Sequence, residues 1–156
     1  MHASMQNAGA LIAARYGVNN IDVVAGGSGD AVEVNGAWID RRGFSSLKVI
    51  IPYTATLGAG ETLAVAANLQ DASDGNGTGA ADFGDALTST AQATGESGGS
   101  TETGVVELDF DLSGADRYVR IQFTPNLSRA NTDTAALSAH YVLAGATENP
   151  VTASAI

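Results

Sequence analysis

The amino-acid sequence predicts an all-β protein, an antiparallel β-sandwich or jelly roll. Runs of alternating apolar and polar residues occur about seven to nine times, and breaks rich in Gly, Asn, Asp and Ser separate them. Hydrophobic residues make up 44% of the chain but aromatic residues only 6%. Such small aliphatic side chains suit thin β-layers better than a helical bundle. With 156 residues, one domain buries a core without disulfides or metals.

Residues 1–20 are predicted to form an N-terminal arm. Ala8 to Tyr16 could form one or two helical turns, with Asn7 as the cap and Gly17 closing the segment. Two interpretations stay open: a frayed terminus, or an extended arm that becomes ordered on a neighbouring subunit. The arm has only a short apolar run, at 10–13, so we expect no signal peptide and a protein made in the cytosol.

A β-sandwich domain is predicted from residue 21 to residue 147. Its first strands flank Asn35-Gly36, a dipeptide typical of tight hairpins, so we expect a hairpin there. Trp38 is the only tryptophan and stands within an apolar run, which favours a place in the core.

The next two predicted strands are Ser46 to Tyr53 and Glu61 to Asp71. Pro52 has no backbone N–H to donate, so the first of these should end there or lie at a sheet edge. Residues 71–103 are rich in Gly, Ser, Thr and Asp. They are predicted to form a long exposed loop with one short strand in its middle.

The final third, residues 105–145, has the strongest period-two alternation. Its strands are expected at 106–112, 118–123 and 135–144, and a C-terminal tail is expected at 148–156. The inward-facing residues should be Val106, Leu108, Phe110, Leu112, Val119, Ile121 and Phe123.

The charge of the chain restricts its partners. It carries 17 acidic and 7 basic residues, for a net charge of −10. This charge repels phosphate backbones and anionic lipids, so we expect no nucleic-acid or membrane partner. The absence of cysteine excludes disulfides and thiolate chemistry.

Residue patterns typical of catalysis are missing from the sequence. The two histidines are His2 and His140, and no nucleophile elbow, Walker loop or dinucleotide fingerprint occurs. Asp109 and Asp111 alternate beside Glu107, as on a solvated strand face. We therefore expect no enzyme activity and no cofactor.

One segment has the spacing of a calcium loop. Its oxygen-bearing residues fall at positions 1, 3, 5, 9 and 12, with Gly79 at position 6. Helical flanks are missing and the last ligand is Asp in place of Glu, so an ordinary mobile turn is the favoured interpretation. The weak candidates are Asp74, Asn76, Thr78, Asp82 and Asp85.

The few basic residues are candidates for subunit contacts. In so acidic a chain an arginine usually pairs with a carboxylate, either within the fold or across an interface. The internal pair is the default, including for Arg117 and Arg120. The interface candidates are Arg15, Tyr16, Arg41, Arg42 and Arg129.

The segment from Arg117 to Gly145, with RYVRIQFTPNLS, NTDTA and the closing VLAG, resembles capsid decoration (cement) proteins of tailed bacteriophages. The pieces IPYTATLGAGETL from Ile51 and ADFG from Ala81 fit the same pattern. The likeness covers roughly residues 45–147 and contains no catalytic motif.

This resemblance implies a β-rich subunit that forms a homotrimer on the outer surface of the expanded phage head. There it would bridge subunits of the major capsid protein, without cofactor or enzyme activity. Two alternatives remain: a head–tail connector or tail component, and a carbohydrate-binding sandwich that uses Trp38 and Tyr53 for stacking.

Overall fold

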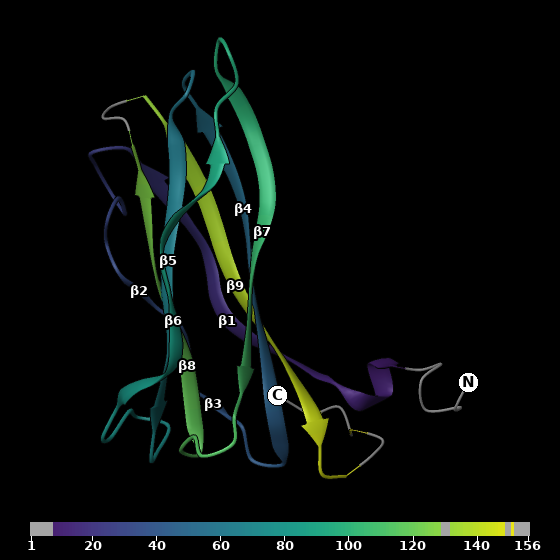
Figure 1. Ribbon diagram of the computed structural model, residues 1–156. Coiled ribbons are helices and arrows are strands. Elements are labelled where there is room, and N and C mark those ends of the chain that lie inside the picture. The colour runs from purple at the N-terminus through teal and green to yellow at the C-terminus, as the bar shows by residue number, and fades with distance from the viewer. Residues whose placement is uncertain (1–7, 129–131, 149–150, 152–156) are drawn as a thin grey trace.

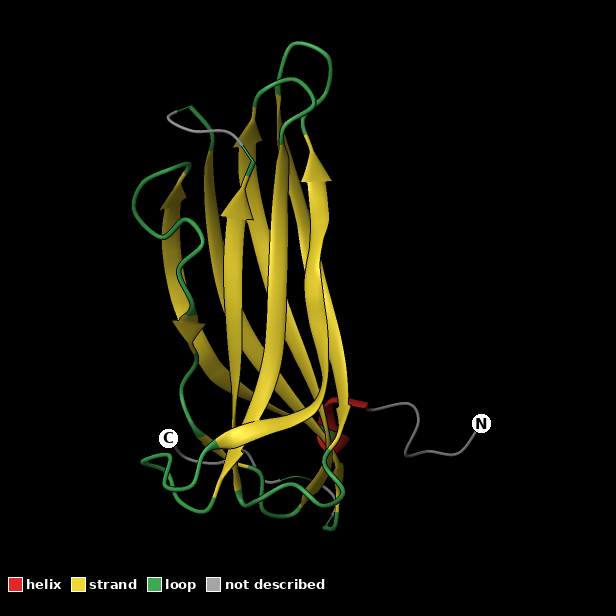
Figure 2. Ribbon diagram, turned by 60° about the vertical axis from the view of Figure 1, so that its left-hand side comes forward, coloured by secondary structure: helices red, strands yellow, loops and turns green. Residues whose placement is uncertain are grey.

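The protein consists of two antiparallel sheets packed face to face (Figures 1 and 2). The structure is a computed structural model, and it describes residues 8–128, 132–148 and 151. One sheet has the strand order β1-β9-β4-β7; the other has the order β2-β8-β5-β6, with β3 also paired to β8. The predicted β-sandwich is thus confirmed. The bounds are η2 Ala8–Leu11, β1 Ala13–Val24, β2 Val34–Asn35, β3 Ile39–Asp40, β4 Phe44–Leu57, β5 Thr62–Ala72, β6 Ala81–Thr94, β7 Ser100–Asp111, β8 Tyr118–Leu127 and β9 Thr134–Ala146.

The core lies between the sheets and follows the period-two pattern of the sequence. Alternate residues of β4, β5, β8 and β9 point inward, because successive side chains of a strand face opposite sides of its sheet. Leu108 is only partly buried, while the other predicted inward residues of β7 and β8 are at most 7% exposed. The largest fully buried side chains are Tyr141, Phe123, Leu47, Ile51, Leu63, Leu69, Leu112, Ile121, Leu137, Leu143, Val23 and Val49.

Strand β4 lies in the interior of its sheet, which corrects the prediction for Pro52. The strand continues to Leu57 and pairs with β7 on one side and β9 on the other. Pro52 pairs with Val105 of β7, while the ladder to β9 is interrupted at Ile51 and Pro52 and resumes in the same register at Tyr53. Pro52, which has no backbone N–H to donate, therefore lies where the pairing between β4 and β9 is interrupted.

The predicted hairpin at Asn35-Gly36 is wrong, because β2 and β3 do not pair with each other. Asn35 pairs with Gln122 and Ile39 with Val119, both in β8. The chain from Gly36 to Trp38 therefore interrupts one side of the β8 ladder. A tight turn would reverse the chain, whereas these residues continue along the same neighbour.

Tyr141 of β9 supplies the hydrogen bonds that this interruption leaves open. Its hydroxyl accepts a hydrogen bond from Ile121 N (3.0 Å) and donates one to Ala37 O (3.0 Å). Gly36 N donates to Ile121 O (2.8 Å). A Cβ on Gly36 would stand 2.4 Å from the Tyr141 hydroxyl, so only glycine fits here. The side chain of Tyr141, from one sheet, is thus hydrogen-bonded to the backbone of the other sheet.

The N-terminal arm is shorter than predicted. Residues 13–20 belong to β1, which pairs with β9, and among the described residues of the arm only η2 is helical. β1 has register shifts between Tyr16 and Val18 and between Val18 and Ile21. These irregularities break the period-two pattern and conceal the strand in the sequence. No helix in the described parts of the chain is long and apolar enough to cross a membrane.

The segment 71–103 is mostly strand, which corrects the prediction of one long loop. β6 occupies 14 residues of it and β7 begins at Ser100. β6 pairs only with β5, and most of its side chains are exposed. An edge strand with small, solvent-facing residues has no hydrophobic alternation to reveal it. Of the predicted tail, residues 149–150 and 152–156 lie outside the described residues.

Candidate functional site

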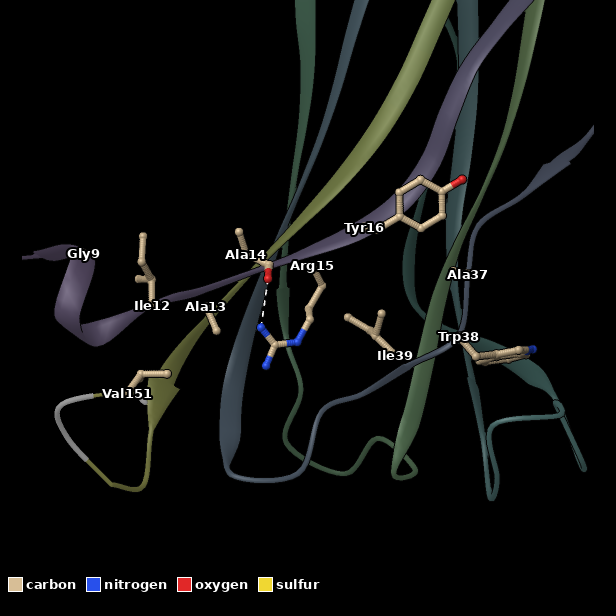
Figure 3. A pocket seen from close by; sticks show the side chains of 10 residues that line it. All are labelled: Gly9, Ile12, Ala13, Ala14, Arg15, Tyr16, Ala37, Trp38, Ile39 and Val151. Carbon is tan, nitrogen blue, oxygen red and sulfur yellow. Dashed lines mark hydrogen bonds between the residues drawn. The ribbon is translucent and has the colours of Figure 1, made fainter. Parts of the chain in front are cut away.

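A groove of about 550 Å³ opens at the lower end of the sandwich as drawn in Figure 1, where β1 begins and β3 lies. Figure 3 shows it running beneath β1, from η2 to the connection between β2 and β3. We call it the base groove. Its lining residues are Gly9, Ile12, Ala13, Ala14, Arg15, Tyr16, Ala37, Trp38, Ile39 and Val151.

Two backbone hydrogen bonds hold the walls of the base groove. Ala37 N donates to Gly17 O (2.9 Å), which fixes the β2–β3 connection against β1. Val151 N donates to Ala10 O (2.8 Å), which joins the other end of the groove to η2. The groove is therefore built from three segments that are far apart in the sequence, residues 9–16, 37–39 and 151.

Arg15 and Tyr16, two predicted interface residues, both line this groove. The Arg15 guanidinium donates to Ala14 O (2.8 Å), and no carboxylate of the described residues lies within ion-pair distance of it. Tyr16 is 60% exposed, and its hydroxyl accepts a hydrogen bond from Asn19 N (3.0 Å). An unpaired cation beside an exposed ring is suited to binding an apolar group that carries negative charge.

Trp38 is half-buried at the edge of the groove, so its predicted place in the core is wrong. The Arg120 guanidinium lies 4.6 Å from the Trp38 ring centroid and donates to Gln70 Oε1 (2.8 and 3.0 Å). One face of the indole ring is therefore occupied by a cation. Tyr53 does not line this groove, and its hydroxyl donates to Gln92 O (2.7 Å).

Arg41 and Arg117 are bonded within the fold. Arg41 donates to the carbonyls of Ala115 and Asp116, and Arg117 forms an ion pair of 2.6 Å with Asp40. The hydrogen bond from Arg117 holds the pKa of Asp40 below its ordinary value. The default of an internal carboxylate partner is thus correct for Arg117.

Arg42 is more open than these. Its side chain is 74% exposed and lies 4.0 Å from Asp40, so it remains available for a subunit contact. Arg129 lies outside the described residues. Among the described interface candidates, Arg15 and Tyr16 line the same groove, whereas Arg41 and Arg42 do not line it.

The calcium-loop candidates are not gathered around one point. Asp74, Asn76 and Thr78 lie in the loop between β5 and β6, whereas Asp82 and Asp85 lie within β6. The Asp74 carboxylate accepts hydrogen bonds from the Thr78 hydroxyl (2.8 Å) and from the backbone N–H groups of Asn76 and Thr78. These bonds, the one from the Thr78 hydroxyl first, lower the pKa of Asp74.

Asp82 accepts hydrogen bonds from Asn68 and Gln70. In the described parts of the chain, no group of three or more His, Asp or Glu side chains could hold a metal ion.

The remaining acidic and histidine candidates face solvent. His140 is exposed on β9, and Lys48 bridges Glu107 (3.2 Å) and Asp109 (2.9 Å) on the outer face of β4 and β7. The paired carboxylates raise the pKa of Lys48, the hydrogen bond that Lys48 donates to Asp109 contributing most. This arrangement matches the solvated strand face predicted from the sequence.

A polar network on the outer face of the second sheet was not foreseen. Gln122, only 6% exposed, donates to Glu33 (2.8 Å) and Asn35 (2.6 Å) and accepts from Asn68 (3.1 Å). It joins β2 to β5 across β8. The outward position of Gln122 follows from alternation, but its partners come from distant segments that only the fold brings together.

Comparisons with known proteins give a fold likeness and no family. No family model matches the chain, and no curated protein matches it. Among solved structures, the infectious bursal disease virus Gx strain covers 89% of this chain at 11% identity, with a TM-score of 0.44. The VP2 subviral particle of infectious bursal disease virus covers 89% at 12% identity, with a TM-score of 0.45.

A bacterial structure matches about as well. Dimeric latent PorU from Porphyromonas gingivalis covers 86% of this chain at 12% identity, with a TM-score of 0.43. The chain spans 34% and 33% of the two viral chains and 12% of the PorU chain. Likenesses this distant do not by themselves indicate a function.

Proposed function

We propose that this chain is a structural virion protein that binds the outer surface of a phage head. It acts as a homotrimer that bridges major capsid subunits and stabilises the expanded capsid, without cofactor, enzyme activity, nucleic acid or membrane. The resemblance of residues 45–147 to decoration proteins supports this proposal. The chain would be made in the host cytoplasm and end in the virion.

The base groove is the observation that carries the proposal. Among the described residues its lining contains no His, Asp, Glu, Ser or Thr, and its one side-chain hydroxyl, that of Tyr16, accepts a hydrogen bond from Asn19 N. The groove offers instead apolar walls, the exposed Tyr16 ring and the Arg15 guanidinium. Such a surface is suited to binding another protein.

We assign to the groove an apolar segment of the major capsid protein that carries a carboxylate. The carboxylate would pair with Arg15, which has no such partner within the described parts of its own chain. The apolar side chains would cover Ile12 and Tyr16, which are 39% and 60% exposed. Burial of a tyrosine and a bidentate arginine is typical of the residues that dominate binding energies.

The test uses expanded, empty heads assembled from the major capsid protein of the same phage. Light scattering should give the mass of a trimer, and the chain should sediment with heads at hundreds of copies per particle. Tyr16→Ser should weaken binding by about 30-fold, the loss of one strong interface residue, with an unchanged melting temperature. Val32→Ser, at a residue that is 54% exposed in the loop between β1 and β2, is the matched control.

Two results would overturn the proposal. A monomer that does not sediment with heads excludes the decoration role. About a dozen copies per particle would place the chain at the head–tail junction instead. If Tyr16→Ser and Val32→Ser bind equally well, the base groove is not the contact surface.

A further inference from the structure

A second cleft, of about 480 Å³, lies at the opposite end of the sandwich from the base groove. We call it the tip cleft. It is formed where β4 ends, β7 begins and the chain enters β9. Its lining residues are Thr56, Leu57, Gly58, Gly98, Gly99, Ser100, Thr101, Thr132 and Asp133.

Asp133 is the unusual residue of the tip cleft, because it is a carboxylate that is only 2% exposed. Its Oδ1 accepts hydrogen bonds from Gly58 N (2.9 Å) and from the Thr132 hydroxyl (3.3 Å). Both donors belong to residues that line the cleft, so the carboxylate stands at its wall.

The other oxygen of Asp133 has no hydrogen-bond partner within the described residues. Oδ2 is the one buried side-chain oxygen or nitrogen of the described residues without a hydrogen bond. Burial of an incompletely paired carboxylate is destabilising by several kcal/mol, so such a group requires an explanation, commonly an ion or a water molecule. No basic residue among the described parts of the chain lines the cleft to neutralise it.

We propose that the tip cleft is a Ca²⁺ site in which Asp133 supplies the charged ligand. The side-chain donors of the lining are all oxygen, from one carboxylate and the hydroxyls of Thr56, Ser100, Thr101 and Thr132. Hard oxygen donors are typical of Ca²⁺, whereas Zn²⁺ and copper prefer nitrogen and sulfur. Ca²⁺ also tolerates irregular geometry and several water ligands, as an open cleft would impose.

The neighbouring charges favour a cation as well. Ser100, which lines the cleft, donates a hydrogen bond to Glu102 (2.6 Å), and the chain as a whole has a net charge of −10. A single carboxylate in the lining makes the site weak, with a dissociation constant of about 0.1–1 mM, as in extracellular calcium modules. The site is independent of the base groove, so its test does not depend on capsid binding.

The test measures Ca²⁺ binding to the purified full chain. At about 10 mM Ca²⁺ the melting temperature should rise by about 3–10 °C over the chain in EDTA, from the ratio of ligand to dissociation constant. The same concentration of Mg²⁺ and a matched ionic strength of NaCl are the controls for general screening of the acidic surface. In ¹H–¹⁵N spectra the Gly58 amide should shift most, because it donates to Asp133.

Variants locate the effect. Asp133→Asn should abolish the Ca²⁺-dependent rise in melting temperature and leave the stability in EDTA unchanged or higher, because it removes a buried charge. Asp85→Asn, which removes the same charge at an exposed position of β6, should respond to Ca²⁺ like the parent chain.

Three results would overturn the proposal. The first is an equal response to Mg²⁺, the second is an unchanged Ca²⁺ response in Asp133→Asn, and the third is a set of amide shifts scattered over exposed carboxylates. The amide shifts are measured on the parent chain, so this last result decides the question even if Asp133→Asn fails to fold.

Discussion

Replacement of Tyr141 by phenylalanine tests how the two sheets are joined. Tyr141 is fully buried, and its hydroxyl occupies the gap in the β8 ladder between Ile121 N and Ala37 O. The ring would keep its packing in Tyr141→Phe, so the substitution removes only the two hydrogen bonds. It leaves one buried backbone donor and one backbone acceptor without a partner.

The size of the effect follows from the burial of these two groups. Loss of a partner for a buried N–H such as that of Ile121 is destabilising by about 1–3 kcal/mol. Ala37 is half-buried, so water can reach its carbonyl, and the loss there is about 0.5–1.5 kcal/mol. We therefore expect a decrease of about 2–4 kcal/mol in the free energy of unfolding, and of about 5–15 °C in melting temperature.

Urea and thermal unfolding of Tyr141→Phe, Tyr53→Phe and Tyr16→Phe measure this decrease in the free energy of unfolding. Tyr53→Phe loses a half-buried bond to the carbonyl of Gln92, worth about 0.5–1.5 kcal/mol. Tyr16→Phe loses a bond on the exposed surface and should stay within about 0.5 kcal/mol of the parent chain. If Tyr141→Phe is no less stable than Tyr53→Phe, the hydroxyl of Tyr141 does not complete the ladder and our reasoning is refuted.

Two further predictions concern pH. Burial raises the pKa of Tyr141 above its ordinary value of 10.0, so this tyrosine ionises at lower pH in the unfolded chain and stability should fall as pH rises above about 10. Urea midpoints should decrease with pH in the parent chain and decrease less steeply in Tyr141→Phe. Equal slopes in the two proteins would contradict the prediction. The hydrogen bond from Arg117 lowers the pKa of Asp40 below its ordinary value of 3.8. The ion pair therefore stabilises the fold fully above pH 3.8, and this stabilisation is lost as the pH falls through the lowered pKa of Asp40. Arg117→Ala should reduce stability only slightly at neutral pH, as is typical of a surface ion pair. It should also flatten the acid limb of the unfolding curve, and an acid limb of unchanged steepness would count against this prediction.

The inward faces of the long central strands could be read from the sequence. Leu47, Val49 and Ile51 alternate with polar or half-buried residues, and all three are fully buried. A strand with one buried face must repeat its apolar residues at every second position, so the sequence pattern predicts which side chains face the core. The same reasoning placed Val119 and Ile121 correctly.

Edge strands were harder to recognise. The small, exposed residues of β6 carry no alternation, and register shifts in β1 displace the apolar positions. The prediction that Trp38 lies in the core was wrong because its environment depends on a distant residue. An indole ring in an apolar run usually lies in the core, but here Arg120 lies over one of its faces and the ring stays at the surface.

Local periodicity and composition are properties of the chain alone, so the amino-acid sequence was enough to predict the class of the fold, the faces of its longest strands and the acidic surface. Folding brings Arg15 and Tyr16 into one groove with Trp38 and Val151. Folding also buries Asp133 with one oxygen that has no partner among the described residues. Such sites depend on which distant segments meet, and long-range pairing of strands is set by packing and backbone hydrogen bonds that no local pattern encodes.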